Sequence, residues 1–334
     1  RVEEALRRSQ EVLDRARAQA PTVREASVWE GVSRRARILD ERTARANWRG
    51  WLPAIALAAA LPGGEVVHTL PAHRYLSWNV AEYAAFRAAT PRGGVVFDIG
   101  ANVGAYSVLF GQWVGPCGTV VAFEPQPEIC RGLAAHVRLN QLQAVVRPVM
   151  AAVGDREHAA PLIVSATAGE SRLAVAADLP VDFRGDHPTH DHTGYTTALP
   201  ADRNLAGSDP RRPTDVPGVT MTPVLSLDRF CARERLQPDV IKVDVEGWEL
   251  AVLRGARELI ARSPKLALFV ELHPSIWPLL GTSRAELLAE LEAQQLTIEA
   301  IDVPARDHGT GAGADDVWAV EGVCVRLRRR SCAS

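Results

Sequence analysis

From residue 93 onward, short apolar runs alternate with segments of helical period. Strands that alternate with helices in this way build a mostly parallel sheet with helices on both of its faces. The sequence therefore predicts an α/β fold. The predicted strands are 93–100, 118–125, 145–155, 239–247 and 265–274, and the stretches 296–303 and 316–328 are predicted to close the sheet as an antiparallel pair.

The first part of the chain lacks this alternation. Residues 1–90 are predicted to form an N-terminal helical extension, rich in Ala, Arg and Glu at its start and with a weak amphipathic stripe. Its second part, 64–90, reads as a short strand or turn followed by a helix. We expect the first helices either to pack on the α/β domain or to dock a second copy of the chain or a partner module.

The α/β domain, residues 91–334, contains an insertion at about 156–220 that is rich in Pro, Gly, Asp, Thr and His. A loop of this length inside a compact domain is usually a lid, a binding loop or a disordered segment. We expect a lid in which His190, His192 and Tyr195 contact the substrate, with disorder as the alternative.

The insertion also contains "DHPTHDH", which brings four possible metal ligands close together in sequence: His187, His190, Asp191 and His192. Such residues can hold a divalent metal ion when a rigid framework fixes their geometry. No predicted strand or helix does so here, and the sequence therefore predicts no metal site.

Composition bounds the partners and the compartment. Of the 334 residues, 47% are hydrophobic and 23% are charged, which is typical of a globular protein. The formal net charge of -2 creates no field that would attract nucleic acid or an anionic membrane, so we expect neither as a partner. The longest apolar run, 51–62, is too short to span a bilayer. Five cysteines without a CxxC spacing favour reduced thiols and a cytoplasmic location.

The turn after the first of these strands, "DIGANVG", indicates the kind of nucleotide. A dinucleotide-binding turn has the pattern G-x-G-x-x-G, but here Asn102 and Ala105 occupy the second and third glycine positions. Asp98 at the strand end would also repel a diphosphate. S-adenosylmethionine carries an ammonium and a sulfonium, which favour an acid, and its carboxylate can use the amides at the helix N-terminus. A tight turn without a ligand is the alternative.

Glu124 follows the second predicted strand, where an acid accepts hydrogen bonds from ribose hydroxyls in nucleotide-binding folds. Pro125 and Gln126 beside it, and Ala152 beyond the third strand, could border an adenine ring. This placement favours an adenosine ligand, but it does not separate S-adenosylmethionine from NAD.

Charged residues also mark the ends of two later strands. Alternation in "VIKVDVEGWE" puts Lys242, Asp244 and Glu246 on one face, where charges are costly unless they are paired or take part in chemistry. We expect Lys242 to bridge Asp98 or Asp244, and the two acids to be functional. His273 ends the next strand on the same face as Glu271, and the ordinary pKa of histidine suits it to accept a proton near neutral pH.

Taken together, residues 93–275 resemble the FkbM-type methyltransferases, a branch of the class I S-adenosylmethionine-dependent fold. The matching stretches are "FDIGANVGAYS", "VVAFEPQPE", "AAVGD", "SLDRF", "PDVIKVDVEGWELAVLRGA" and "FVELHP". The resemblance implies a Rossmann-like sheet of seven strands, mostly parallel with the last one antiparallel. It also implies S-adenosylmethionine as the methyl donor and, usually, O-methylation of a hydroxyl on a natural product or a sugar.

The resemblance also implies roles for individual residues. Glu124 would hold the ribose, and Asp244 would lie near the methyl group. The residues implied at the methionine end of the donor are Asp98, Gly100, Asn102 and Gly104. Ala101, between them, is also expected to contact the cofactor.

We therefore expect a methyltransferase that acts on a small hydroxylated acceptor. His273 or Glu246 is expected to accept the proton and Asp244 to orient the donor or the acceptor. Three alternatives stay open at this point: an N-methyltransferase, an NAD-dependent oxidoreductase, and a non-catalytic S-adenosylmethionine-binding scaffold whose N-terminal helices recruit a partner.

Overall fold

The structure is a computed structural model, and it describes part of the chain. The described residues are 57–70, 73, 76, 78–163, 172–173, 219–301, 316–318 and 321–330. The predicted N-terminal helices before residue 57 and the predicted substrate residues His190, His192 and Tyr195 lie outside the described residues. These expectations therefore stay predictions.

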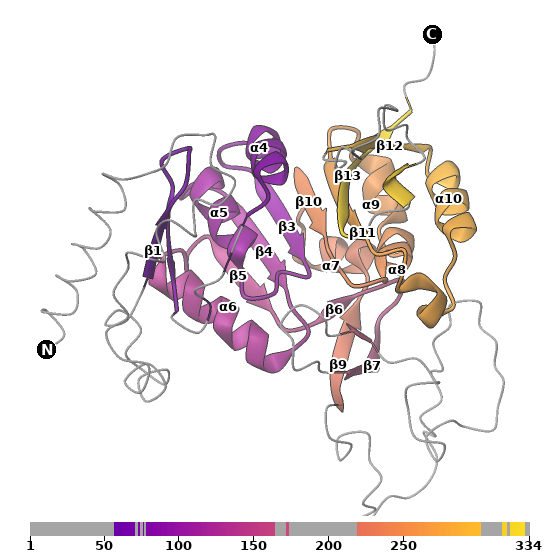
Figure 1. The fold of residues 1–334 in the computed structure, drawn as a ribbon, viewed down its shortest axis with the longest axis horizontal. Coiled ribbons are helices and arrows are strands. Elements are labelled where there is room, and N and C mark those ends of the chain that lie inside the picture. The colour runs from indigo at the N-terminus through magenta and orange to yellow at the C-terminus, as the bar shows by residue number, and fades with distance from the viewer. Residues whose placement is uncertain are drawn as a thin grey trace, which may run out of the picture. The chain divides into compact units, whose positions relative to one another are not determined.

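Seven of the described strands are hydrogen-bonded into one sheet, and Figure 1 labels each of them. Its strands are β3 (Val95–Ile99), β4 (Thr119–Phe123), β5 (Val146–Val149), β10 (Val240–Val243), β11 (Ala267–Leu272), β12 (Leu296–Ala300) and β13 (Val323–Arg329). Their order is β12-β13-β11-β10-β3-β4-β5. β10 and β11 are parallel, whereas β13 runs antiparallel to both β11 and β12. The predicted α/β sheet with an antiparallel last strand is confirmed.

The chain divides into two compact units, Arg1–Ala122 with Glu128–Pro148, and Phe123–Pro127 with Val149–Ser334. In the first unit the described elements before β3 are the antiparallel strands β1 (Leu57–Ala60) and β2 (Val66–Thr69) and the helix α4 (Val80–Ala89). The helix begins at Asn79, whose side chain accepts hydrogen bonds from the amides of Ala81 and Glu82. The expected short strand and helix within 64–90 are thus present.

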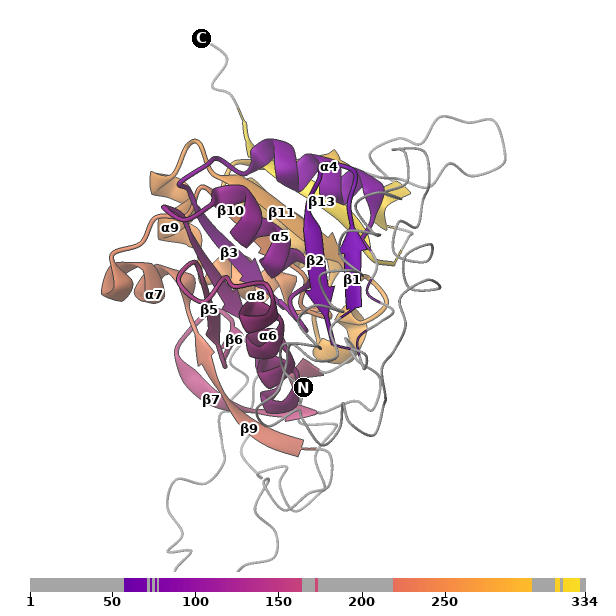
Figure 2. The same ribbon diagram turned by 90° about the vertical axis from the view of Figure 1, so that its left-hand side faces the viewer.

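The β1–β2 hairpin is tied to two helices through the buried acid Glu65, in the turn between its strands. The Glu65 carboxylate accepts hydrogen bonds from the Tyr83 hydroxyl at 2.7 Å and from Trp113 Nε1 at 2.8 Å, and it pairs with Arg87. Tyr83 and Arg87 lie on α4, and Trp113 lies on α5 (Ala105–Val114), which Figure 2 shows near the hairpin. A buried carboxylate is costly unless it is paired in this way, so these contacts fix the hairpin against the helices.

The remaining helices follow the strands as the alternating pattern predicts. They are α6 (Pro127–Leu139), α7 (Leu227–Glu234), α8 (Glu249–Arg254), α9 (Arg257–Arg262), α10 (Arg284–Ala293) and the 3-10 turns η6 (Trp277–Leu280) and η7 (Asp316–Trp318). At the start of α10, Ser283 and Glu286 form a capping box. None of the helices in the described ranges is both long and apolar enough to cross a membrane.

A second sheet, which the sequence did not predict, lies within the second unit. Its strands are β6 (Ala152–Val153), β7 (His158–Ile163), β8 (Arg172–Leu173) and β9 (Val219–Leu225), in the order β6-β9-β7-β8. The single strand expected over 145–155 is wrong, because this stretch divides into β5 of the main sheet and β6 of the second one. The described ends of the expected insertion are therefore paired strands. Their apolar side chains, including Leu162 and Val224, pack with Trp248 and Leu280.

Candidate active site

The turn between β3 and α5 has a backbone that requires glycine. Gly100, Asn102 and Gly104 all have positive φ angles, of 75°, 50° and 89°. At Gly104 the φ of 89° would strain any residue that has a Cβ atom, and Cδ1 of Leu133, 2.4 Å from the Cβ position, would have to move. The N-cap residue of α5 is Gly104, which has no side chain that could accept a hydrogen bond from the amides of the first helical turn.

Asp98 lies near the end of β3 and is 1% exposed. Its Oδ2 atom accepts a hydrogen bond of 2.5 Å from the Ser107 hydroxyl, in the first turn of α5. The carboxylate is thus held at the base of the glycine turn. Ala101, which was also predicted to contact the cofactor, is buried within the turn.

His136, a buried residue on α6, forms a hydrogen bond with the backbone of the turn between β3 and α5. His136 donates from Nδ1 to the carbonyl oxygen of Val103 at 2.6 Å, and its Nε2 accepts from the amide of Leu70 at 3.0 Å. Because a neutral Nε2 is needed to accept, the ring is uncharged. Burial outweighs the bond to Val103, which would raise the pKa of His136, and together with a smaller effect of the nearby His73 it lowers that pKa to about 4.

Glu124, in the second unit, directly follows β4. It is buried, and its Oε1 atom accepts a hydrogen bond of 2.8 Å from the amide of Gln126. The carbonyl oxygen of Pro125 lies 3.4 Å from the Thr222 hydroxyl on β9, and Ala152 begins β6. The three residues predicted to contact the adenosine part of a ligand therefore belong to one compact unit.

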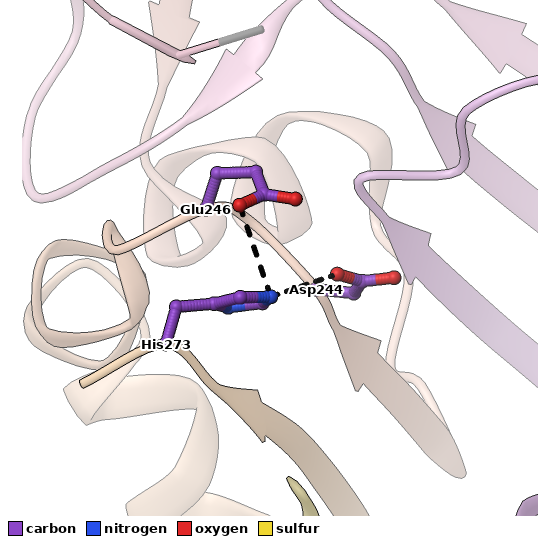
Figure 3. A group of neighbouring side chains, drawn as sticks. All are labelled: Asp244, Glu246 and His273. Carbon is purple, nitrogen blue, oxygen red and sulfur yellow. Dashed lines mark ion pairs between the residues drawn. The ribbon is translucent and has the colours of Figure 1, made fainter. Parts of the chain in front are cut away.

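The ends of β10 and β11 bring Asp244, Glu246 and His273 together, as Figure 3 shows. Nε2 of His273 lies 3.9 Å from Oδ1 of Asp244 and 3.9 Å from Oε2 of Glu246. Lys242 donates to the other oxygen of Asp244 at 2.9 Å, which orients that carboxylate. His273 is 5% exposed. The side chains of Asp244 and Glu246 are 30% and 27% exposed, so the cluster has a buried base and an accessible rim.

The backbone between the two acids and α8 is unusual. Glu246 has a φ of 30° and Gly247 a φ of 91°. A Cβ atom on Gly247 would lie 2.7 Å from Cγ2 of Ile276 and 2.7 Å from Cδ1 of Leu280. The tight turn therefore requires glycine, and a non-glycine residue such as Glu246 in the left-handed region is typical of a functional site.

Glu249 is a part of this site that the sequence analysis missed. Its side chain is 0% exposed. Oε1 accepts from Nδ1 of His273 at 2.8 Å and from the amide of Gly247 at 3.0 Å, and Oε2 accepts from Nε1 of Trp277 at 2.7 Å. The one signal in the sequence is an acid that stands alone in the apolar stretch "WELAVL". Glu249 fixes the orientation of the His273 ring.

The charges around His273 change its titration. Burial alone would lower its pKa, but the hydrogen bond that it donates to Glu249 and the charges of Glu249, Asp244 and Glu246 outweigh burial and raise the pKa to about 9. A fourth carboxylate, Glu271, has Oε1 3.7 Å from Nε2. Burial raises the pKa of Glu246, while His273 lowers it. The ordinary histidine pKa assumed from the sequence therefore does not hold, and the imidazole carries its second proton at neutral pH.

The fold defines the class of protein. The strand order, with antiparallel β13 between β11 and β12, is that of a Rossmann-like class I methyltransferase. The sequence matches the Methyltransferase FkbM domain over residues 98–296. The chain belongs to the FkbM methyltransferase family, as the sequence resemblance predicted.

Comparison with solved structures finds methyltransferases at low sequence identity. An S-adenosylmethionine-dependent O-methyltransferase from Thermotoga maritima is 10% identical, with a TM-score of 0.36, over 83% of this chain and 78% of that one. A precorrin-6y C5,15-methyltransferase from Geobacter metallireducens is 11% identical, with a TM-score of 0.37, over 77% and 92%. Aeropyrum pernix fibrillarin with natively bound S-adenosyl-L-methionine is 12% identical, with a TM-score of 0.35, over 81% and 93%. A comparison with curated protein sequences finds no match.

Proposed function

We propose that this protein transfers a methyl group from S-adenosylmethionine to a hydroxyl group of a small molecule. The observation that carries the proposal is the cluster of Asp244, Glu246 and His273 at the ends of β10 and β11, within an FkbM methyltransferase domain. In open α/β sheets, ligands bind at the carboxyl ends of the strands. The cluster contains carboxylates that can accept a proton, and it is partly exposed, so the hydroxyl that receives the methyl group can reach it.

The glycine turn supports S-adenosylmethionine as the donor. Asp98, Gly100, Ala101, Asn102 and Gly104 would hold the methionine end of this donor. The amides at the start of α5 suit its carboxylate, and an acid at the strand end suits its positive charges. The turn lacks the G-x-G-x-x-G pattern of dinucleotide-binding turns, because Asn102 and Ala105 occupy its second and third glycine positions.

Three residues are proposed to contact the adenosine part of the donor. Glu124 would accept hydrogen bonds from the two ribose hydroxyls, and Pro125 and Ala152 would border the adenine. Gln126 already donates its amide to Glu124, which leaves the carboxylate oriented for this task.

In the reaction, the acceptor oxygen attacks the methyl carbon in line with the carbon–sulfur bond. That bond breaks, and sulfur takes the electron pair and becomes the neutral thioether of S-adenosylhomocysteine. The acceptor proton passes to Glu246 and then to water, while Asp244 orients the donor or the acceptor. His273, which already carries its second proton at neutral pH, would stabilise the charge that Glu246 and Asp244 carry. Most of the rate enhancement would come from alignment of the reacting atoms.

The second sheet bears on the acceptor side of the proposal. Its apolar face packs on Trp248 and Leu280, close in sequence to Glu246 and His273, and residues 174–218 connect β8 with β9. We assign acceptor contacts to His190, His192 and Tyr195 in this connection. The near-neutral net charge of -2 supports a small acceptor, such as a natural product or a sugar, rather than nucleic acid.

Calorimetric titration with S-adenosylhomocysteine, with NAD as the control ligand, tests the donor site. We expect micromolar binding of S-adenosylhomocysteine alone and at least tenfold weaker binding to Asp98→Ala. Binding of NAD, or no binding by folded protein, would refute the proposal.

A matched panel of alcohols and amines, assayed by mass spectrometry, tests the acceptor. Methyl ethers are the expected products. Methylation of amines alone would replace the O-methylation assignment. The His273→Asn variant should bind S-adenosylhomocysteine normally and turn over more slowly, and equal turnover would remove His273 from the reaction.

A further inference from the structure

We propose that Asp244, Glu246 and His273 bind a divalent metal ion, for which Mn²⁺ is the appropriate probe. The sequence predicted no metal, since the histidines in the insertion lacked a framework. These three residues have one, because parallel neighbouring strands and a glycine turn position them. That the ion binds the acceptor rests on the proposed function, whereas its binding to the protein does not.

The spacing of the donor atoms suits one ion. One ligand atom from each of the three residues lies within 4.8 Å of the others. Metal–ligand bonds of about 2.1 Å place two donors of one ion between about 3 and 4.2 Å apart. The distances of 3.9 Å from Nε2 of His273 to both carboxylates fall in this interval. Closure of the remaining distance requires movements of less than about 1 Å.

Nε2 of His273 lies near the carboxylates of several neighbouring residues. His273 is buried, and the carboxylate oxygens of Asp244, Glu246 and Glu271 lie 3.7 to 3.9 Å from its Nε2. A hydrogen bond to a carboxylate would be about 2.7–2.9 Å long. All three carboxylates lie beyond hydrogen-bonding distance of Nε2, which leaves room for an ion between them. The ion would take the place of the second proton of His273, which binding releases.

The other side of the histidine ring is built as in metal centres. Ligating histidines usually donate their second nitrogen to a carboxylate or carbonyl, which fixes the ring and raises its basicity. Glu249 accepts from Nδ1 of His273 at 2.8 Å and is itself held by Trp277 and Gly247. Lys242 orients Asp244 in the same way by binding its outer oxygen, which leaves Oδ1 directed at the cluster.

The donor set also indicates the class of ion. Two carboxylates and one imidazole suit Mn²⁺ and related divalent ions, since carboxylates favour hard ions and imidazole favours first-row transition metals. Three protein ligands leave coordination positions for water and for an acceptor oxygen on the exposed side of the carboxylates. A hydroxyl bound to such an ion loses its proton to solvent more readily, and the resulting alkoxide can attack the methyl carbon.

The test uses the full chain after removal of metal ions with EDTA. Mn²⁺ is added, and free Mn²⁺ is measured by its electron paramagnetic resonance signal, with pulsed measurements to detect nitrogen bound to the ion. We expect one bound Mn²⁺ per chain, coupled to one imidazole nitrogen. Asp244→Asn, Glu246→Gln and His273→Gln should each weaken binding at least tenfold, and His273→Gln should abolish the nitrogen coupling.

Two further variants separate ligation from charge. Glu249→Gln should weaken Mn²⁺ binding about tenfold through the histidine that it holds. Glu321→Gln removes an exposed carboxylate, which accepts from the amide of Ser275 and acts on Glu246 through its charge alone, so binding should change less than twofold. An equal loss in Glu321→Gln and Glu246→Gln would mean nonspecific attraction and would overturn the proposal.

Absence of Mn²⁺ binding by folded wild-type protein, or binding without nitrogen coupling, would also overturn it. Titration of the same metal-free sample with S-adenosylhomocysteine keeps the two proposals apart. Donor binding without Mn²⁺ binding would refute the metal site and leave proton acceptance by Glu246. Mn²⁺ binding without donor binding would refute the methyl-transfer proposal and leave the metal site standing.

Discussion

Nδ1 of His273 lies 2.8 Å from Oε1 of Glu249, and the carboxylate of Glu249 is completely buried. The same carboxylate accepts from the Trp277 indole at 2.7 Å. Glu249 thus joins the end of β11, the start of α8 and the turn η6 through one side chain. The position of His273 depends on a helix residue as much as on its own strand.

Replacement of this buried carboxylate should destabilise the protein. Glu249→Ala leaves the Trp277 indole and His273 without their acceptor, and we expect a loss of about 3 kcal/mol in the free energy of unfolding. Glu249→Gln retains one acceptor oxygen and should cost less. Urea unfolding measures both, with the exposed Glu292→Ala as a control that changes stability by less than about 0.5 kcal/mol. Equal stability of Glu249→Ala and Glu292→Ala would contradict this role.

The neutral His136 should make stability depend on pH. Its pKa is lowered to about 4 in the folded protein from the ordinary histidine value of 6.5, so the unfolded chain binds the proton more readily. Its contribution is therefore fully present above pH 6.5 and is lost as the pH falls toward 4, by about 3 kcal/mol in total. His73, which faces His136 and whose pKa burial also lowers, acts in the same direction.

Urea unfolding between about pH 7 and pH 4 checks this prediction. The His136→Gln variant should be less stable than wild type at neutral pH, because it loses the bonds to Val103 and Leu70. Its stability should also fall less steeply with decreasing pH. Parallel pH curves for the two proteins would show that His136 does not carry the effect.

The turn after Glu246 should not tolerate a side chain. Gly247→Ala brings a Cβ atom to 2.7 Å from Ile276 and Leu280 and puts alanine at a φ of 91°. Gly281→Ala is the matched control, because Gly281 also has a positive φ, 68°, but nothing lies within 4 Å of its Cβ position. We expect Gly247→Ala to cost about 2 kcal/mol more than Gly281→Ala in thermal or urea unfolding. Equal costs would mean that backbone strain alone matters at both sites.

Glu124 offers a test of the ribose contact in the proposed donor site. Glu124→Gln keeps the size of the side chain and an acceptor for the Gln126 amide, but it removes the charge that strengthens bonds to the ribose hydroxyls. Calorimetry should show S-adenosylhomocysteine binding weakened by about tenfold or more. The exposed Glu128→Gln should bind as wild type does, and the same affinity in both variants would remove Glu124 from the site.

The main sheet could be predicted because its strands are apolar runs between helical segments. "VVFDI" became β3, and the pair β12 and β13 formed as expected. The second sheet could not be predicted, because proline stands in both of its longer strands. Pro161 on β7 pairs with Met221, and Pro223 on β9 pairs with Ala159. Proline lacks an amide donor and normally argues against a strand, so the sequence indicated a loop here.

Some residues of the candidate site could be predicted from the sequence, and others could not. Asp244, Glu246 and His273 could be named from the sequence because each follows a strand, where charge is informative. Glu249 could not, because it acts across the fold on residues 24 and 28 positions away. The raised pKa of His273 likewise depends on carboxylates that only the fold brings together.

The position of β13 has a consequence for synthesis of the protein on the ribosome. β11, which leads into His273, pairs with β10 on one side and with β13 on the other, and β13 consists of residues 323–329. Until those residues emerge during translation, β11 keeps one open row of backbone amides and carbonyls. An unpaired apolar strand edge is prone to pair with other chains. The nascent chain therefore completes the strand that carries its candidate active-site histidine late in translation, and a chain released before Val323 would present this edge to its neighbours.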